Sequence, residues 1–280
     1  MKKSRKRLLI SSVAMLLVAM LALGTATFAW FTTSTTATAN GINVRTSKTS
    51  TLKISDNARD YGTGFSYSEE ASEFKPVAIM LPASSANGTN WYATIADNTN
   101  AFDPKTSETP AAVSDAKHVY MNQLNIQNAG AVAVNDITIT ISGLSSSYGK
   151  VAVVPVESKA QTGKAVVAIP SGVDFKNFVF ADAATQYAPI TAAGALPTAT
   201  DAKITPKAAT GGTFVISKTT PGFSNLASLN AADESTAAGE LHYNIYVWFE
   251  GQDSDCKDAN AGTNPLSALE FTVSGTPVEG

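Results

Sequence analysis

An acidic cluster near the C-terminus is the group of residues in this chain whose types and spacing best suggest chemistry. Glu250, Asp253, Asp255 and Asp258 fall within nine residues, directly after an aromatic-rich segment. Hard cations such as calcium take several carboxylate and carbonyl oxygens from loops of this kind. The spacing lacks the glycine and the late glutamate of an EF-hand loop. The cluster therefore predicts either a non-standard calcium site, with calcium as the one candidate cofactor, or a solvated polar turn.

Motifs that would mark an enzyme are missing from the sequence. His118 and His242 are the only histidines, and no His-Glu-x-x-His zinc motif occurs. A Gly-x-Ser-x-Gly elbow, a Cys-x-x-Cys pair and a phosphate-binding P-loop are also missing. We expect His242, in an alternating strand pattern, to be structural and His118 to be exposed. The chain is therefore predicted not to be an enzyme.

The first 29 residues predict export from the cell. Five basic side chains come first, an apolar run follows from Leu8 to Leu23, and small residues come next. This is the pattern of a secretory signal peptide, residues 1–29, with cleavage between Ala29 and Trp30. An uncleaved anchor is the alternative, because residues 26–31 could extend the apolar segment to roughly the ~20 residues of a spanning helix. We expect a secreted, extracellular or cell-surface protein that meets the membrane and the signal peptidase only through this segment.

The rest of the chain is weakly charged and rich in small and hydroxyl-bearing residues. Charged residues make up 15% of the sequence, below the ~25% of typical globular domains. The net charge of −3 becomes −8 once the five positive charges of the leader are removed, which argues against nucleic acid as a partner. Cys256 is the single cysteine, so no intramolecular disulfide can form, and we expect this thiol to be buried.

Short stretches with two-residue periodicity predict an all-β fold. Residues 137–141 alternate Ile and Thr without a break, as in a strand with one buried and one wet face. Similar stretches recur between turn residues, at the spacing of an antiparallel sandwich. The predicted strands are residues 41–45, 51–55, 75–82, 91–95, 120–126, 137–141, 151–156, 165–169, 177–180, 213–217, 241–249 and 269–273. Short helices are expected within residues 224–238 and 265–269.

These patterns together predict an antiparallel jelly-roll-like β-sandwich preceded by the signal helix. The sandwich would be a single domain over residues 47–280, with long loops near residues 97–115 and 181–212. Residues 30–46 would form an N-terminal extension or a donor strand.

Two segments resemble a known group of exported proteins. Residues 26–32, Ala-Thr-Phe-Ala-Trp-Phe-Thr, resemble the signal region of Firmicute proteins cut by the SipW-type signal peptidase. Residues 246–256, Tyr-Val-Trp-Phe-Glu-Gly-Gln-Asp-Ser-Asp-Cys, are similar to a late strand-and-loop motif in clostridial members of this group. The group contains the TasA biofilm-matrix fibre proteins and the camelysin-like proteins. The resemblance covers both ends of the chain and little between Lys48 and Leu241.

The resemblance implies a secreted structural protein of the cell envelope or biofilm matrix. Fibre subunits of this kind give an N-terminal strand to a neighbour's sheet, and Ile42 and Val44 in the matching segment would point to one face. The partners would be further copies of the chain or related matrix subunits. The segment could instead be the first strand of its own domain or a stalk. The peptidase activity described for camelysin is not carried over, because no metal-ligand set or triad occurs.

A second hypothesis, from another class, is a monomeric extracellular module that binds glycan or calcium. Trp91, Tyr92, Tyr246 and Trp248 could form a platform for sugar rings. Aromatic side chains more often fill the interior of a sandwich, so we expect these four in the core. A secreted peptidase is the least supported hypothesis.

Overall fold

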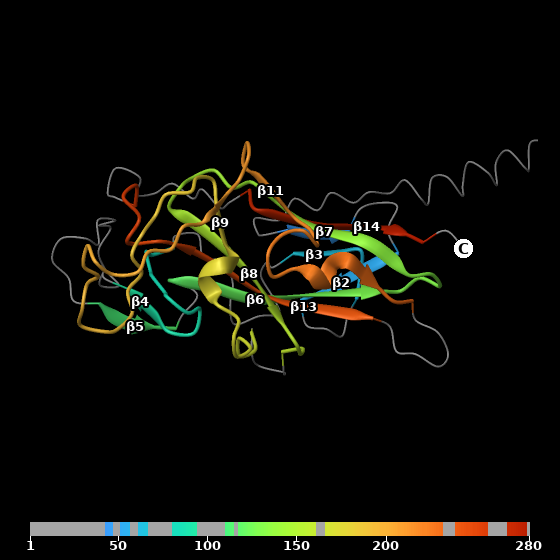
Figure 1. The fold of residues 1–280 in the computed structure, drawn as a ribbon, viewed down its shortest axis with the longest axis horizontal. Helices are drawn as coiled ribbons and strands as arrows, with labels where there is room; N and C mark the ends of the chain where they lie inside the picture. The colour runs from blue at the N-terminus through green and yellow to red at the C-terminus, as the bar shows by residue number, and fades with distance from the viewer. Residues whose placement is uncertain are drawn as a thin grey trace, which may run out of the picture. The chain divides into compact units, whose positions relative to one another are not determined.

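Strands account for nearly all the regular structure in the described part of the chain (Figure 1). The computed structural model describes residues 43–46, 51–56, 61–66, 80–93, 110–114, 117–160, 166–231, 239–256 and 268–278. These residues all belong to one compact unit, Ala39–Gly280. The predicted signal peptide, its cleavage site at Ala29 and Trp30, and Ile42 lie outside the described residues. No helix among the described residues is long and apolar enough to cross a membrane.

Two six-stranded sheets form the frame of the molecule. In the first, called sheet A, the order is β11 (Thr213–Ile216), β7 (Val134–Ser142), β14 (Glu270–Pro277), β1 (Asn43–Thr46) and β3 (Gly64–Ser66), with β12 (Ser228–Leu229) also paired to β7. In the second, called sheet B, the order is β10 (Lys207–Ala208), β9 (Val179–Ala181), β8 (Gly149–Val156), β13 (Glu240–Phe249), β6 (Val119–Asn128) and β2 (Leu52–Ser55). A small separate pair consists of β4 (Trp91–Ala93) and β5 (Ala111–Val113).

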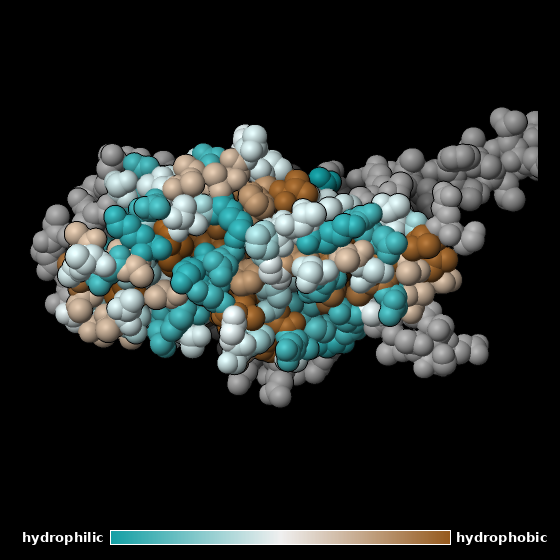
Figure 2. Space-filling view, viewed as in Figure 1, coloured by the Kyte–Doolittle hydropathy of each residue, from teal (hydrophilic) through white to brown (hydrophobic). Residues whose placement is uncertain are grey.

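Strand β7 follows the alternation that its sequence predicts. Ile137, Ile139 and Ile141 are fully buried, whereas the two threonines between them are partly exposed. The Thr138 hydroxyl lies 2.7 Å from that of Ser274 on β14, so the outer face is also paired across strands. In the view of Figure 2, hydrophilic and neutral residues cover most of the described surface, and the hydrophobic patches are small and separate.

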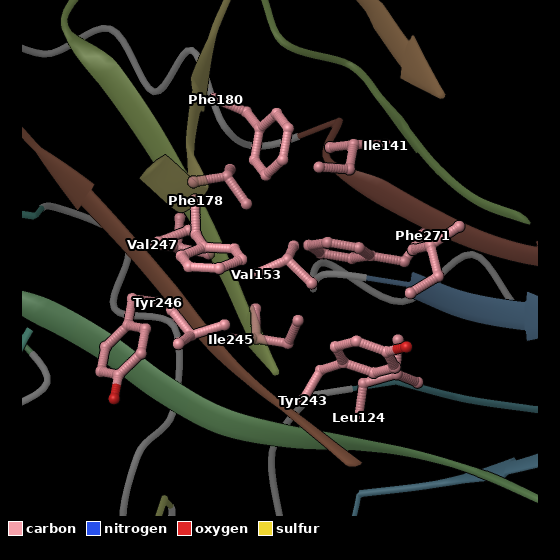
Figure 3. Close-up of a cluster of buried hydrophobic side chains, with 14 of the residues drawn as sticks. Leu124, Ile141, Val153, Phe178, Phe180, Tyr243, Ile245, Tyr246, Val247 and Phe271 are labelled. Carbon is pink, nitrogen blue, oxygen red and sulfur yellow. The ribbon is translucent and has the colours of Figure 1, made fainter. Parts of the chain in front are cut away.

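The inward faces of both sheets contribute to one hydrophobic core. Figure 3 shows Leu124, Val153 and Ile245 from sheet B near Ile141 and Phe271 from sheet A. Each is almost completely buried, and burying a side chain of this size is worth roughly 1.5–3 kcal/mol. An all-β fold with a shared core is therefore established, as the periodicity predicted.

Consecutive long strands along the chain belong to different sheets. β6 pairs with β13 and β2 in sheet B, whereas the next strand, β7, pairs with β14, β11 and β12 in sheet A. β13 and β14 are divided in the same way. Two pairs depart from the expected antiparallel arrangement, because β1 runs parallel to β14 and β10 runs parallel to β9.

Two segments differ from their sequence-based predictions. Residues 166–169 form no strand, because the Asn244 side chain binds both backbone groups of Val167: its Oδ1 accepts from the amide at 3.2 Å and its Nδ2 donates to the carbonyl at 2.7 Å. Residues 224–227 form only a 3-10 turn, and the chain then extends into β12. The pairing of β12 with β7 outweighs local helix preference there.

The two predicted loops contain more structure than their composition suggests. Residues 111–113, within the first predicted loop, form β5. Between β9 and β10 no strand or 3-10 turn forms among residues 182–206, but Tyr187, Ile190 and Ile204 are buried. Tyr187 and Ile204 also exchange backbone hydrogen bonds of 3.1 and 2.8 Å. The second loop is therefore a packed strap.

Candidate functional site

The acidic residues follow β13 in a pair of tight turns. The Asp253 amide donates to the Glu250 carbonyl and the Cys256 amide donates to the Asp253 carbonyl, both at 3.1 Å. The Gly251 amide also donates to the Ala83 carbonyl at 3.1 Å, which ties the turn to a neighbouring segment. This backbone network turns the side chains of Glu250 and Asp253 inward, where both are fully buried.

A buried lysine pairs with Asp253. Lys150 lies on β8, opposite Trp248 in the β8–β13 register, and its Nζ is 2.8 Å from Asp253 Oδ2. Neither side chain has any solvent exposure. The ammonium also donates to the Ser147 carbonyl and lies 5.3 Å from the centre of the Tyr187 ring. Desolvating two charges costs several kcal/mol per ion unless they are paired and hydrogen-bonded, so removing one partner and leaving the other charged would strongly destabilise the fold.

Glu250 is a second buried carboxyl in the same turn. Trp248 Nε1 donates to its Oε2 at 3.0 Å, the Gln252 amide donates to its Oε1 at 3.1 Å, and Ser84 adds a side-chain hydrogen bond. Burial raises the pKa of Glu250 to about 7, and the opposing effects of these donors and of Lys150 only partly offset it. Glu250 is therefore partly protonated near neutral pH.

Tyr187 closes the network on the side of the strap. Burial is the main cause that raises its pKa well above the usual value, and the charges of Glu250 and Asp253 add to the effect. Its hydroxyl is buried and has no hydrogen-bond partner within the described structure. Lys150, Asp253, Glu250 and Tyr187 therefore form a water-excluded polar group, which we call the buried network.

The calcium hypothesis stays a prediction. Glu250 and Asp253 accept hydrogen bonds from protein donors, and the ammonium of Lys150 supplies the positive charge beside Asp253. Asp255 is exposed and accepts from the Ser147 hydroxyl at 2.5 Å, and Asp258 lies outside the described residues. Among the residues that the structure describes, no three His, Cys, Asp or Glu side chains converge as a metal site would require.

Of the two assembly residues, the structure describes Val44. Val44 lies on β1, is buried, and is opposite Phe271 of β14 and Phe65 of β3 in the strand registers. The next residue, Arg45, points outward and forms an ion pair with Glu270. The segment therefore has one inward and one outward position, as a strand at the interior of a sheet requires.

Both histidines and Cys256 are largely enclosed by the fold. His242 Nδ1 lies 2.7 Å from Asn125 Oδ1, and burial lowers its pKa. His118 is buried, contrary to the prediction of exposure, and the neighbouring Lys117 carbonyl accepts a hydrogen bond of 2.7 Å from the Leu81 amide, which joins a distant segment to the chain at this point. Cys256 is fully buried, which confirms the expectation from its sequence context.

The aromatic residues lie mostly in the core. Trp91, Tyr246 and Trp248 are almost completely buried, and the rings of Trp91 and Trp248 meet edge to face at 5.1 Å. Tyr92 is partly exposed. Three of the four side chains are therefore unavailable as an open platform for sugars, and their packing adds roughly 0.5–1.5 kcal/mol per aromatic pair beyond burial.

Sequence reasoning missed two members of the buried network. A signal for Lys150 was present, because a lysine directly precedes the continuous apolar run of residues 151–154. Such a run is typical of a strand buried on both faces, where a charge needs a partner. Tyr187 gave no local signal, since it lies in a segment without periodicity.

Comparison with family models, curated proteins and solved structures finds no match to this chain.

Proposed function

We propose that this chain is a secreted structural protein of the cell envelope or biofilm matrix. Its subunits would be jelly-roll-like β-sandwiches that assemble by donating an N-terminal strand. The observation that carries the proposal is the position of β1, which runs parallel to β14 in a sheet whose other described pairs are antiparallel. A strand that enters a sheet from another chain is free to take either direction.

Backbone pairing supports strand exchange. β1 has four residues, pairs with four positions of β14 and three of β3, and buries the one side chain Val44. Removing it would leave a row of unpaired backbone groups on both neighbours. The same segment of another copy would satisfy those groups and fill the same pocket. Within one sheet, the resident strand and a donated strand therefore compete for one position.

The described surface favours backbone pairing over an apolar contact. The large hydrophobic residues exposed among the described residues are only Val132, Val215 and Val278. Contact surfaces of stable oligomers usually include a broad apolar patch. A donated strand needs no such patch, because main-chain hydrogen bonds provide much of its affinity.

The test is electron microscopy of the mature chain, beginning at Trp30, after incubation at high concentration. We expect regular filaments from the parent chain and none after deletion of residues 30–46. A synthetic peptide covering residues 39–48 should raise the melting temperature of the deleted chain by filling the open position in sheet A. Filaments that form equally well without residues 30–46 would rule out strand donation.

A point variant tests the role of β1 independently of the rest of residues 30–46. Val44→Asp places a charge in a buried pocket and should prevent filament formation. Arg45→Gln changes the neighbouring outward residue and is the matched control, expected to leave filaments intact. A parent chain that stays monomeric under all conditions would favour the extracellular binding module instead.

A further inference from the structure

The Lys150 amine and the Asp253 carboxyl lie close enough together for an amide bond to form between them. Nζ lies 2.8 Å from Oδ2, and neither side chain is exposed. Two reactive groups that the fold holds side by side react much faster than free groups, because their translational and rotational freedom has already been lost on folding. Water, which would favour the separated ions, is kept out by the strap and its Tyr187 ring 5.3 Å away.

We propose that Lys150 and Asp253 become joined by an intramolecular isopeptide bond after the chain folds. One proton passes from the ammonium to the carboxylate, which leaves an amine and a carboxylic acid. Nζ then attacks Cγ, a C–N bond forms, and the bond from Cγ to Oδ2 breaks. Nζ gives up a second hydrogen, and Oδ2 departs with both as water. Nothing is oxidised or reduced, and no further reactant is needed.

Two neighbouring groups support this step. Glu250 lies three residues before Asp253 in the same turn, its charge interacts with Lys150, and its pKa of about 7 suits it to accept and return a proton. The Asp255 amide donates to Asp253 Oδ1 at 3.0 Å. As Nζ adds to Cγ, negative charge develops on Oδ1, and this fixed donor stabilises it.

The chain contains its own comparison for this pair. Lys159 Nζ lies 2.6 Å from Glu240 Oε2, an equally short contact, but the two side chains are 41% and 18% exposed. Solvent reaches both of these ions, and the buried carboxyls of the described residues, Glu250 and Asp253, both belong to the other site. Proximity alone therefore does not select the reacting pair, and we expect Lys159 and Glu240 to remain unlinked.

The bond would act as a covalent brace. It would join the first residues of β8 to the turn that follows β13 and close a loop between positions 103 apart in sequence. Closing a long loop reduces the freedom of the unfolded chain, as a disulfide does. Because Cys256 is its single cysteine, the chain cannot form an intramolecular disulfide. This inference does not depend on strand donation.

The test is peptide mapping and mass measurement of the purified, folded full chain. A branched peptide linking Lys150 to Asp253 is expected, lighter than its two parts by one water molecule. Trypsin should not cut at Lys150, whereas the Lys159 and Glu240 peptides should be recovered unlinked. Recovery of the Lys150 and Asp253 peptides as separate species from folded protein would overturn the proposal, and this result needs no variant.

Variants then test each role. Lys150→Met and Asp253→Ala should give the full sequence mass, and Asp253→Asn should give the same branched peptide by loss of ammonia. Glu250→Gln keeps the shape of the side chain and should leave the chain folded, by circular dichroism, but unlinked. A fully linked Glu250→Gln chain would overturn the role assigned to Glu250, and a linked peptide that maps to another lysine would overturn the choice of Lys150.

Discussion

Burial acts differently on Lys150 of β8 and on Glu250 in the turn after β13. Lys150 keeps a direct ionic partner in Asp253, so its desolvation is balanced by a short contact. Among the described residues, Glu250 accepts hydrogen bonds from Trp248, Gln252 and Ser84 instead of forming a direct ion pair, and burial raises its pKa to about 7. At the scale of the residue, the buried network thus holds one carboxyl that lies directly against an amine and one, Glu250, whose pKa is raised by burial.

The raised pKa of Glu250 makes stability depend on pH. The unfolded carboxyl ionises near its ordinary 4.5, and the folded one near 7. Between these values the folded state binds more protons, so the contribution is complete below about pH 4.5 and is lost as the pH rises through about 7. The difference corresponds to roughly 3 kcal/mol at about 1.4 kcal/mol per pH unit. We expect Glu250→Gln to flatten this dependence.

The free energy of unfolding, measured with urea at several pH values between about 5 and 8, gives the effect as the slope of stability against pH. Slopes isolate the titration from any change in absolute stability. Glu157→Gln, which alters an exposed carboxylate, is the matched control and should keep the slope of the parent. Equal slopes in the parent and in Glu250→Gln would contradict the assignment of the proton to Glu250.

At the scale of the element, the end of β7 depends on a close backbone approach. Gly143 follows β7 and has a φ of 82°, a left-handed conformation. A Cβ at this position would lie 2.1 Å from the carbonyl oxygen of Ala268, which leads into β14. The absence of a side chain therefore lets the β7 end and the β14 start come together.

Gly143→Ala is expected to destabilise the fold in two ways. The left-handed conformation costs roughly 1–3 kcal/mol for a residue with a side chain, and the clash with Ala268 adds a further cost of roughly 1–3 kcal/mol. Gly172→Ala is the matched control, since its φ is 86° but a Cβ there meets nothing within 4 Å. Denaturant midpoints that fall equally in both variants would mean that the Ala268 contact can relax.

At the scale of the whole molecule, charge and assembly are linked. Residues 30–280 carry a formal net charge of −8, because the five basic side chains among residues 1–29 are not counted, so approaching copies of this part repel one another. Salt shortens the reach of that repulsion, from ~30 Å at 0.01 M to ~8 Å at 0.15 M. If strand donation joins the subunits, raising the salt should speed filament growth without altering the strand-pairing contacts.

Light scattering with parallel electron microscopy checks this expectation over about 0.01 to 0.15 M sodium chloride. Circular dichroism at each concentration controls for changes in folding. Growth that slows as salt is added would point to attraction between complementary charges, and the subunit contact would then have to be ionic.

The sequence by itself determined the class of local structure and several buried positions. Alternation in residues 137–141 predicts β7 and its inward isoleucines, because side chains of a strand point to opposite faces by turns. The aromatic character of Trp91, Tyr246 and Trp248 likewise predicts their burial. These are consequences of local geometry and of hydrophobicity, which each short segment carries alone.

Only the tertiary structure decided which segments meet. The separation of β6 from β7 and of β13 from β14 into different sheets depends on pairings between distant residues, which periodicity does not encode. The acidic cluster was visible in the sequence, but Lys150, 103 positions from Asp253, was not expected beside it. The physical reason is that a buried charge is acceptable only where a partner arrives from elsewhere in the fold, and that partner is selected by the complete sheet arrangement.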